Sequence, residues 1–150
     1  MNNPGTVTRK ICTAWRLSPL ARSQFFVAYL LLLTITLALK LRGFRWTKRQ
    51  LNRWTRHHVV GALSPQRRST TLAMVRLAVR YSRPWANCLR QSLTLWTMLR
   101  WQGVETVLRI GMRRVGGKLE SHAWLEDQGC VIGDRTEVQQ AYQAFGQAIE

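Results

Sequence analysis

The sequence predicts a mixed α+β fold, in which a helical, strongly basic N-terminal part precedes a small antiparallel sheet. Two observations lead to this prediction. Residues 1–24 are polar and basic, and from residue 25 to about residue 101 apolar residues recur at helical spacing. From Thr106 onward the pattern becomes the alternation of strands separated by glycine turns. Helices followed by a run of strands are typical of the α+β class. A length of 150 residues is enough for one domain, or for one small domain with an appendage.

Charge divides the chain in the same way. All seven carboxylates lie after position 104, whereas residues 1–104 hold 18 of the 23 basic residues and no acid. A cationic surface of this size predicts an anionic partner, which is an acidic protein, an anionic lipid or a nucleic acid. The three cysteines are an odd number and widely spaced, which disfavours a disulfide framework and a zinc site and suits a reducing cytosol. We therefore expect a cytoplasmic protein without a metal or a cofactor.

The segment 25–41 is the most apolar part of the chain. Its roughly 17 residues are at the short edge of what crosses a bilayer. Basic residues flank both of its ends, so they indicate no orientation, and no small-residue cleavage site follows, as a secretory signal would require. Three interpretations stay open: a helix buried in the protein or docked on a partner, peripheral association with a membrane, and a true span.

Residues 42–62 continue with a cationic helical pattern, and we expect 1–63 to form a basic helical region ahead of a core at 64–150. Because adjacent residues of a helix point in different directions, His57-His58 is expected to be a surface pair rather than a metal site. Ser64 and Pro65 predict the N-cap and first position of a helix that reaches Tyr81. Pro84 ends that pattern. The side chains expected to be buried are Leu72, Val75, Leu77 and Val79.

The next helix is expected from Cys88 to about Trp101, with Asn87 as its N-cap. Strands then follow at 106–113, 119–126 and 130–134, with turns at Gly116-Gly117 and at 127–129. A short closing helix is expected within 136–147.

Cys88, His122 and Asp134 form the candidate catalytic set. In the first turn of a helix, unpaired amides and the helix dipole stabilise a thiolate and a developing oxyanion. His122 and Asp134 are each six residues from Gln128, so we expect them to lie opposite each other on paired strands. A thiol, an imidazole and a carboxylate are what a cysteine hydrolase or acyl transferase needs. The structural alternative is a cysteine that only packs in the core. Cys12 and Cys130 have neither a helix start nor a paired histidine, so we interpret them as packing or incidental residues.

Four stretches carry a family resemblance: 85–93 (WANCLRQSL), 108–111 (LRIG), 122–126 (HAWLE) and 132–134 (IGD). Together they resemble the transglutaminase-like leader peptidases of lasso-peptide biosynthesis, in particular the stand-alone peptidase half of the split maturation protein. The resemblance covers about residues 64–135. It implies a papain-like core in which the cysteine helix packs on the sheet, with Cys88 as nucleophile, His122 as general base and acid, and Asp134 as the orienting carboxylate.

The same resemblance implies a function and partners. A cysteine protease of this kind removes the leader from a ribosomally made precursor, so that a separate cyclase can close the ring on the freed amine. In split systems a small companion protein captures the leader and presents it to the peptidase. Trp85, Asn87 and Trp124 flank the candidate site and are candidates for a substrate groove, although both tryptophans are also well suited to packing.

Other functions stay open at this stage. The same triad serves a transglutaminase or an amide acyl transferase, in which an amine rather than water resolves the thioester. A basic nucleic-acid-binding protein accounts for the charge, but no nucleic-acid motif is recognised, so no specific nucleic acid is expected as a partner. A membrane-anchored adaptor accounts for the segment 25–41.

Overall fold

The computed structural model describes residues 18–56, 64–82 and 85–144. The elements are α2 (Pro19–Thr55), α3 (Pro65–Tyr81), α4 (Cys88–Trp101), β1 (Val107–Val115), β2 (Lys118–Asp127), β3 (Cys130–Ile132), α5 (Val138–Ala141) and β4 (Gln143–Ala144). The strands form one sheet in the order β3-β2-β1-β4, with every pair antiparallel. The predicted α+β class is confirmed.

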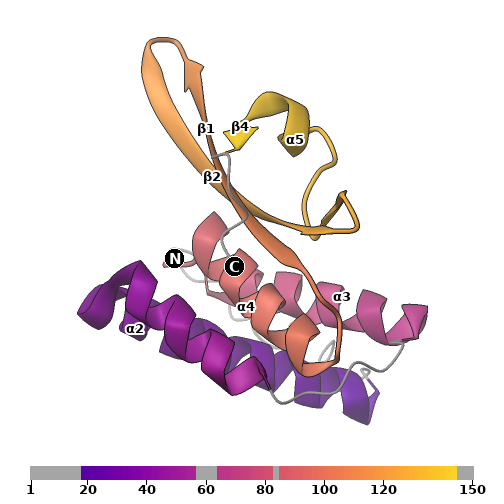
Figure 1. Cartoon of the computed structure of the whole chain (residues 1–150). Coiled ribbons are helices and arrows are strands. Elements are labelled where there is room, and N and C mark those ends of the chain that lie inside the picture. The colour runs from indigo at the N-terminus through magenta and orange to yellow at the C-terminus, as the bar shows by residue number, and fades with distance from the viewer. Residues whose placement is uncertain (1–17, 57–63, 83–84, 145–150) are drawn as a thin grey trace, which may run out of the picture.

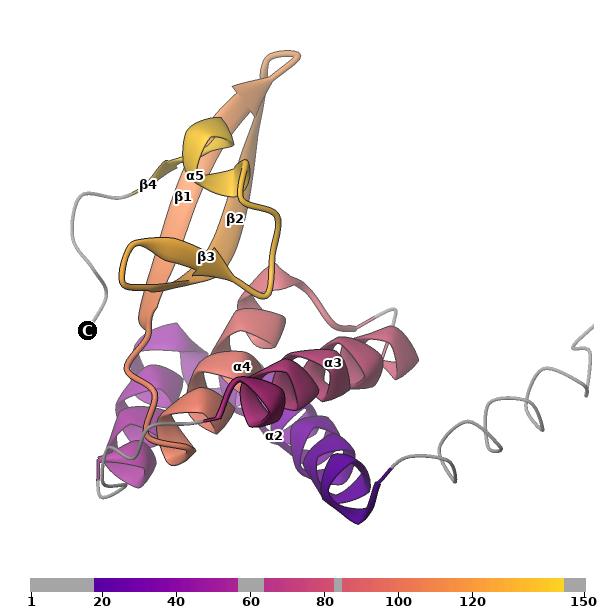
Figure 2. The same ribbon diagram turned by 90° about the vertical axis from the view of Figure 1, so that its right-hand side faces the viewer.

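The three long helices lie on one side of the molecule and the sheet lies on the other (Figures 1 and 2). Helix α2 packs against α3 and α4, and α4 makes most of the contacts between the helices and the sheet. One cluster of buried side chains runs through all three helices into β1, β2 and β3. The helices around the predicted boundary at residue 63 therefore share a core, and the division into two units stays a prediction.

Helix α2 contains the apolar segment and bends once. Gly43 has φ 75° and ψ 177°, which is outside the helical range, so α2 consists of two arms. In the first arm Ala28, Leu32 and Ile35 are completely buried or nearly so. By length and composition α2 is the one helix of the described part of the chain that could cross a membrane, and 33% of its most apolar window is buried in the protein. Burial therefore accounts for one face of the segment 25–41.

Helix α3 begins and ends where the sequence predicts. The Ser64 hydroxyl accepts a hydrogen bond from the Arg67 amide at 3.4 Å, and Pro65 occupies the first helical position. The predicted buried face is correct only at Val75, because α3 packs against both α2 and α4 and so turns a different stripe inward. Leu72, Leu77 and Val79 lie at its edges and are half-buried. The fully buried side chains are Thr71, Met74, Val75 and Ala78.

Helix α4 is held on the sheet by two hydrogen bonds from its buried side. The Ser92 hydroxyl donates to the Ala123 carbonyl of β2 at 2.9 Å, and the Trp96 indole donates to the Thr106 carbonyl at 3.1 Å. All residues from 92 to 99 are buried, because α4 lies between the other helices and the sheet. The predicted packing of the cysteine helix on a small antiparallel sheet is confirmed.

The closing segment differs from its prediction. Its helix, α5, spans only Val138–Ala141, and the chain then forms β4, which pairs with β1 through Gly111 and Met112. Pairing at this edge satisfies backbone groups of β1 that a longer helix would leave exposed. The predictions made for Cys12, His57, His58 and Pro84 concern residues outside the described part of the chain.

Candidate active site

Cys88 is the first residue of α4 and lies directly after a well-formed N-cap. The Asn87 side chain accepts a hydrogen bond from the Arg90 amide at 3.0 Å, and the Asn87 carbonyl accepts from the Gln91 amide at 3.0 Å. The amides of Cys88 and Leu89 come before any intrahelical acceptor, so they stay available to an anion. The thiol and two donors for an oxyanion therefore share one helix end.

His122 and Asp134 contact each other directly. The His122 Nε2 atom lies 2.6 Å from an Asp134 carboxylate oxygen, Oδ2, while the Arg135 amide donates to the other oxygen, Oδ1, at 2.8 Å. Both side chains are partly exposed, at 23% and 30%. Because Nε2 faces the carboxylate, Nδ1 is the ring nitrogen left to exchange a proton with a thiol.

The contact between His122 and Asp134 does not arise from the strand register that the sequence predicted. The turn between β2 and β3 has two central residues, Gln128 and Gly129, with φ of 49° and 82°, which is the pattern of a type I′ hairpin. Asp127 therefore pairs with Cys130 and Leu125 with Ile132. The expected symmetry about Gln128 is wrong by one residue, and β3 ends before Asp134.

Gly133 brings Asp134 to the imidazole. Its φ of 78° is in the left-handed region and redirects the chain after Ile132. A Cβ atom at this position would lie 2.6 Å from Leu95 Cδ2 of α4. The Gly-Asp sequence therefore combines a sharp change of direction with close packing of the backbone on the cysteine helix.

One cavity of about 250 Å³ brings the three candidates together. Asn87 and Trp124 also line it, whereas Trp85 is not among its lining residues and packs edge-on against Tyr29 of α2. Cys130 is exposed at the start of β3. The groove roles of Trp85, Asn87 and Trp124 stay predictions. The cavity is lined by Val79, Ala86, Asn87, Cys88, Gln91, Ser92, Leu95, His122, Ala123, Trp124, Ile132, Gly133 and Asp134.

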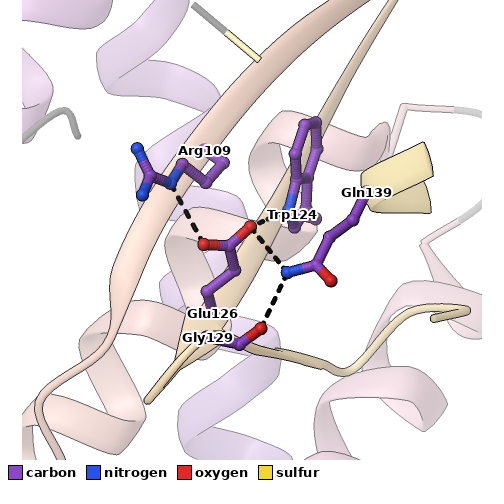
Figure 3. A network of polar contacts seen from close by, with 5 residues as sticks. All are labelled: Arg109, Trp124, Glu126, Gly129 and Gln139. Carbon is purple, nitrogen blue, oxygen red and sulfur yellow. Dashed lines mark hydrogen bonds and ion pairs between the residues drawn. The ribbon is translucent and has the colours of Figure 1, made fainter. Parts of the chain in front are cut away.

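Glu126, to which the sequence analysis assigned no role, is the centre of a polar network beside the site (Figure 3). Its carboxylate accepts from the Trp124 indole at 2.9 Å, from Gln139 at 3.0 Å and from Arg109 at 3.1 Å. Gln139 also donates to the Gly129 carbonyl at 2.9 Å. Burial by itself raises the pKa of Glu126, but the hydrogen bonds from Gln139, Trp124 and Arg109 and the charge of Arg109 outweigh it and hold that pKa below its usual value.

The network fixes a tryptophan that belongs to an aromatic cluster around the imidazole. The His122 ring lies 6.4 Å from the Trp124 ring and 5.2 Å from the Tyr142 ring, both nearly parallel to it. Arg113 lies over Tyr142 at 4.5 Å. Gly111 makes room for this cluster, because a Cβ there would meet Trp124 at 2.8 Å. Tyr142 follows α5, in a segment whose pattern gave no sign that it reaches His122.

The described residues contain no group of three or more His, Cys, Asp or Glu side chains arranged to hold a metal ion. What they contain is a cysteine at a helix start, packed on an antiparallel sheet that carries a histidine–aspartate pair. That combination of fold and site is the one expected of thiol-dependent hydrolases and acyl transferases.

The chain belongs to the transglutaminase-like superfamily, whose sequence profile matches residues 30–147. The match begins within α2 and extends past β4, so it includes all the candidate residues. No curated protein and no solved structure matches the chain. Membership in the superfamily supports thiol-based acyl-transfer chemistry of the type that cysteine peptidases and transglutaminases use.

Proposed function

We propose that this protein is a cysteine peptidase that removes the leader from a ribosomally made lasso-peptide precursor, before a separate cyclase closes the ring. The observation that supports it most is the 2.6 Å contact between His122 and Asp134 at the cavity that Cys88 also lines. The motifs that resemble lasso-peptide leader peptidases coincide with this site. The superfamily assignment supports the chemistry, and the resemblance supplies the substrate.

In the proposed reaction the Cys88 thiolate attacks the carbonyl carbon at the junction of leader and core. The amides of Cys88 and Leu89 stabilise the oxyanion that forms. The carbon–nitrogen bond then breaks, and the protonated His122 gives its proton to the leaving amine, which becomes the N-terminus of the core.

The leader now remains on the Cys88 sulfur as a thioester. His122 takes a proton from water, which attacks the thioester and releases the leader as a carboxylic acid together with the free thiol. The Asp134 carboxylate holds the His122 ring with Nε2 directed toward it, and its charge stabilises the imidazolium in both steps.

A companion protein that holds the leader is part of the proposal. Three exposed arginines of α3, Arg67, Arg76 and Arg80, lie on the helix that contributes Val79 to the cavity. An exposed cationic helix beside a cleft suits a docking face for an acidic leader, companion or cyclase.

The test is incubation of the purified protein with a precursor peptide, with and without the companion, followed by mass spectrometry. Hydrolysis gives the leader acid and the free core, and Cys88→Ala abolishes it, a loss on the order of 10⁴-fold or more. Cys130→Ala is the matched control and retains activity. A leader joined to an added amine would identify an acyl transferase instead. No cleavage in either condition, with DNA binding that Cys88→Ala leaves intact, would favour the nucleic-acid-binding alternative.

A further inference from the structure

The first arm of α2 has a second apolar face, opposite the one that enters the core. Along this outer stripe the spacing is four, three, four and four residues, which keeps the side chains on one side of the helix. Two of its leucines, Leu30 and Leu37, are 60% and 58% exposed. The outer stripe consists of Phe26, Leu30, Leu33, Leu37 and Leu41.

Basic residues lie in line with the stripe at both ends. Arg22 is four residues before Phe26, and Lys40 is three residues after Leu37, so both project from the same face of the helix. Residues 18–56 contain eight basic residues and no acidic one. The outer stripe is therefore rich in leucine, is roughly 22 Å long by helix geometry, and has a cation near each end.

An exposed tryptophan adjoins the end of the stripe. The Arg42 guanidinium lies 5.6 Å from the centre of the Trp46 ring, and this contact spans the bend at Gly43. Trp46 is 41% exposed. Tryptophan and basic side chains beside an apolar helix face are typical of helices that lie in the interface of a lipid bilayer.

We propose that this surface docks the protein on an anionic membrane, with α2 lying in the plane of the interface. The leucines of the outer stripe enter the acyl region, and Arg22, Lys40 and Arg42 contact anionic headgroups. A transmembrane span would require the opposite face, with Ala28, Leu32 and Ile35, to leave the core that it shares with α3 and α4.

Two other occupants fit the surface less well. A second copy of the chain would bring Arg22 and Lys40 against the same cations in a segment without acids, so like charges would face each other. A protein groove usually anchors aromatic, methionine or arginine side chains, whereas this stripe has four leucines and one phenylalanine. Fluid lipid needs no complementary shape and matches both the aliphatic composition and the charge.

The arrangement leaves the catalytic side of the molecule in water. In Figures 1 and 2, α2 and the sheet lie on opposite sides of α4. The cavity lies between α4 and the sheet, so a membrane under α2 does not cover it. Docking is independent of the proposed peptidase activity, and each can fail without the other.

The test is flotation of the full chain with vesicles of phosphatidylcholine alone or of phosphatidylcholine mixed with phosphatidylglycerol. We expect binding to the anionic vesicles that weakens with salt. In Leu30→Gln/Leu37→Gln the bound fraction falls by about tenfold or more, because apolar contact with the bilayer is lost. Val115→Gln/Leu119→Gln, at the far tip of the hairpin, is the matched control, since Leu119 is 59% exposed. Far-UV circular dichroism confirms that both variants fold.

Charge variants form a second pair. Arg22→Gln/Lys40→Gln weakens binding to anionic vesicles, whereas Arg114→Gln/Lys118→Gln at the hairpin tip does not. Failure of the unchanged protein to float, or equal binding by the stripe and tip variants, overturns the proposal. So does a dimer in solution that Leu30→Gln/Leu37→Gln dissociates, because the stripe would then join two copies. Cleavage of a precursor peptide by each variant, measured without vesicles, reports on the peptidase proposal separately.

Discussion

The hairpin formed by β1 and β2 has two ends with the same antiparallel pairing and different surroundings. Toward the tip, residues 112–121 are all exposed, whereas Leu108, Ala123, Trp124 and Leu125 at the other end are buried under α4 and the closing segment. Each end carries an arginine–glutamate pair. The pair nearer the site, Arg109–Glu126, is 29% and 13% exposed at its side chains, and the pair near the tip, Arg113–Glu120, is 39% and 47% exposed.

The two ends of the hairpin separate the effect of strand pairing from the effect of packing against other elements. Both ends form their backbone ladder, and both have glycines with positive φ nearby, at Gly117 and Gly133. At the packed end, side chains from different elements, Cys88, His122 and Asp134, line one cavity. Equivalent substitutions at the two ends should therefore differ in effect.

The largest expected effect concerns Asp134, whose carboxylate contacts the His122 imidazole. Asp134→Asn keeps the size of the side chain but offers His122 an uncharged partner, so the imidazolium loses its stabilising charge. We expect kcat/KM for precursor cleavage to fall by about 10²–10⁴-fold. Asp127→Asn is the control, because Asp127 pairs with Arg68 at 2.7 Å and does not line the cavity. Equal activity of the two variants would remove Asp134 from the mechanism.

Next in size is the difference in reactivity between two cysteines. Cys130 is exposed and Cys88 is half-buried, so access alone favours alkylation of Cys130. We expect iodoacetamide to modify Cys88 faster by about tenfold or more near neutral pH, because cysteines at a helix start and beside an imidazole are in general the more reactive ones. Peptide mass spectrometry measures both rates, and His122→Ala should remove the advantage. A faster Cys130, with and without the companion, would contradict the thiolate–imidazole pair.

The fold is predictable from the sequence where its determinants are local. Ser64 and Asn87 cap the two helices they were expected to cap, and the strands follow the alternation of their side chains. The register between β2 and β3 was wrong by one residue because it depends on how many turn residues adopt positive φ. Two of the three partners of Glu126, Gln139 and Arg109, are 13 and 17 positions away, and Tyr142 is 20 positions from His122. No local pattern encodes contacts of this sequence separation.

A smaller effect, on stability, is expected at the two glycines. Ala at either position has an unfavourable positive φ, which costs about 1–2 kcal/mol. At Gly117 nothing lies within 4 Å of the added Cβ, whereas at Gly133 it meets Leu95 at 2.6 Å. Overpacking adds about 1–3 kcal/mol, so Gly133→Ala should lower the free energy of unfolding more than Gly117→Ala. Urea denaturation measures the free energy of unfolding of both variants. Equal losses would show that Leu95 moves aside without destabilising the protein.

The smallest expected effect compares the two ion pairs. Glu126→Gln removes a partly buried charge that accepts three hydrogen bonds, and we expect a loss of about 1–2 kcal/mol in the free energy of unfolding at neutral pH. Glu120→Gln, in the exposed pair, should change it by less than about 0.5 kcal/mol. Matched urea titrations of the two variants and the unchanged protein give these differences.

The pH dependence of the free energy of unfolding shows whether the charge of Glu126 causes the stabilisation. Folding lowers the pKa of Glu126, so its interactions stabilise the protein fully above the unfolded-state pKa. That stabilisation is lost as the pH falls through the lower, folded-state pKa. The difference between the unchanged protein and Glu126→Gln should therefore shrink in acid. A difference that stays constant with pH would mean that shape and hydrogen bonding, rather than charge, make Glu126 the anchor of Trp124 beside the imidazole.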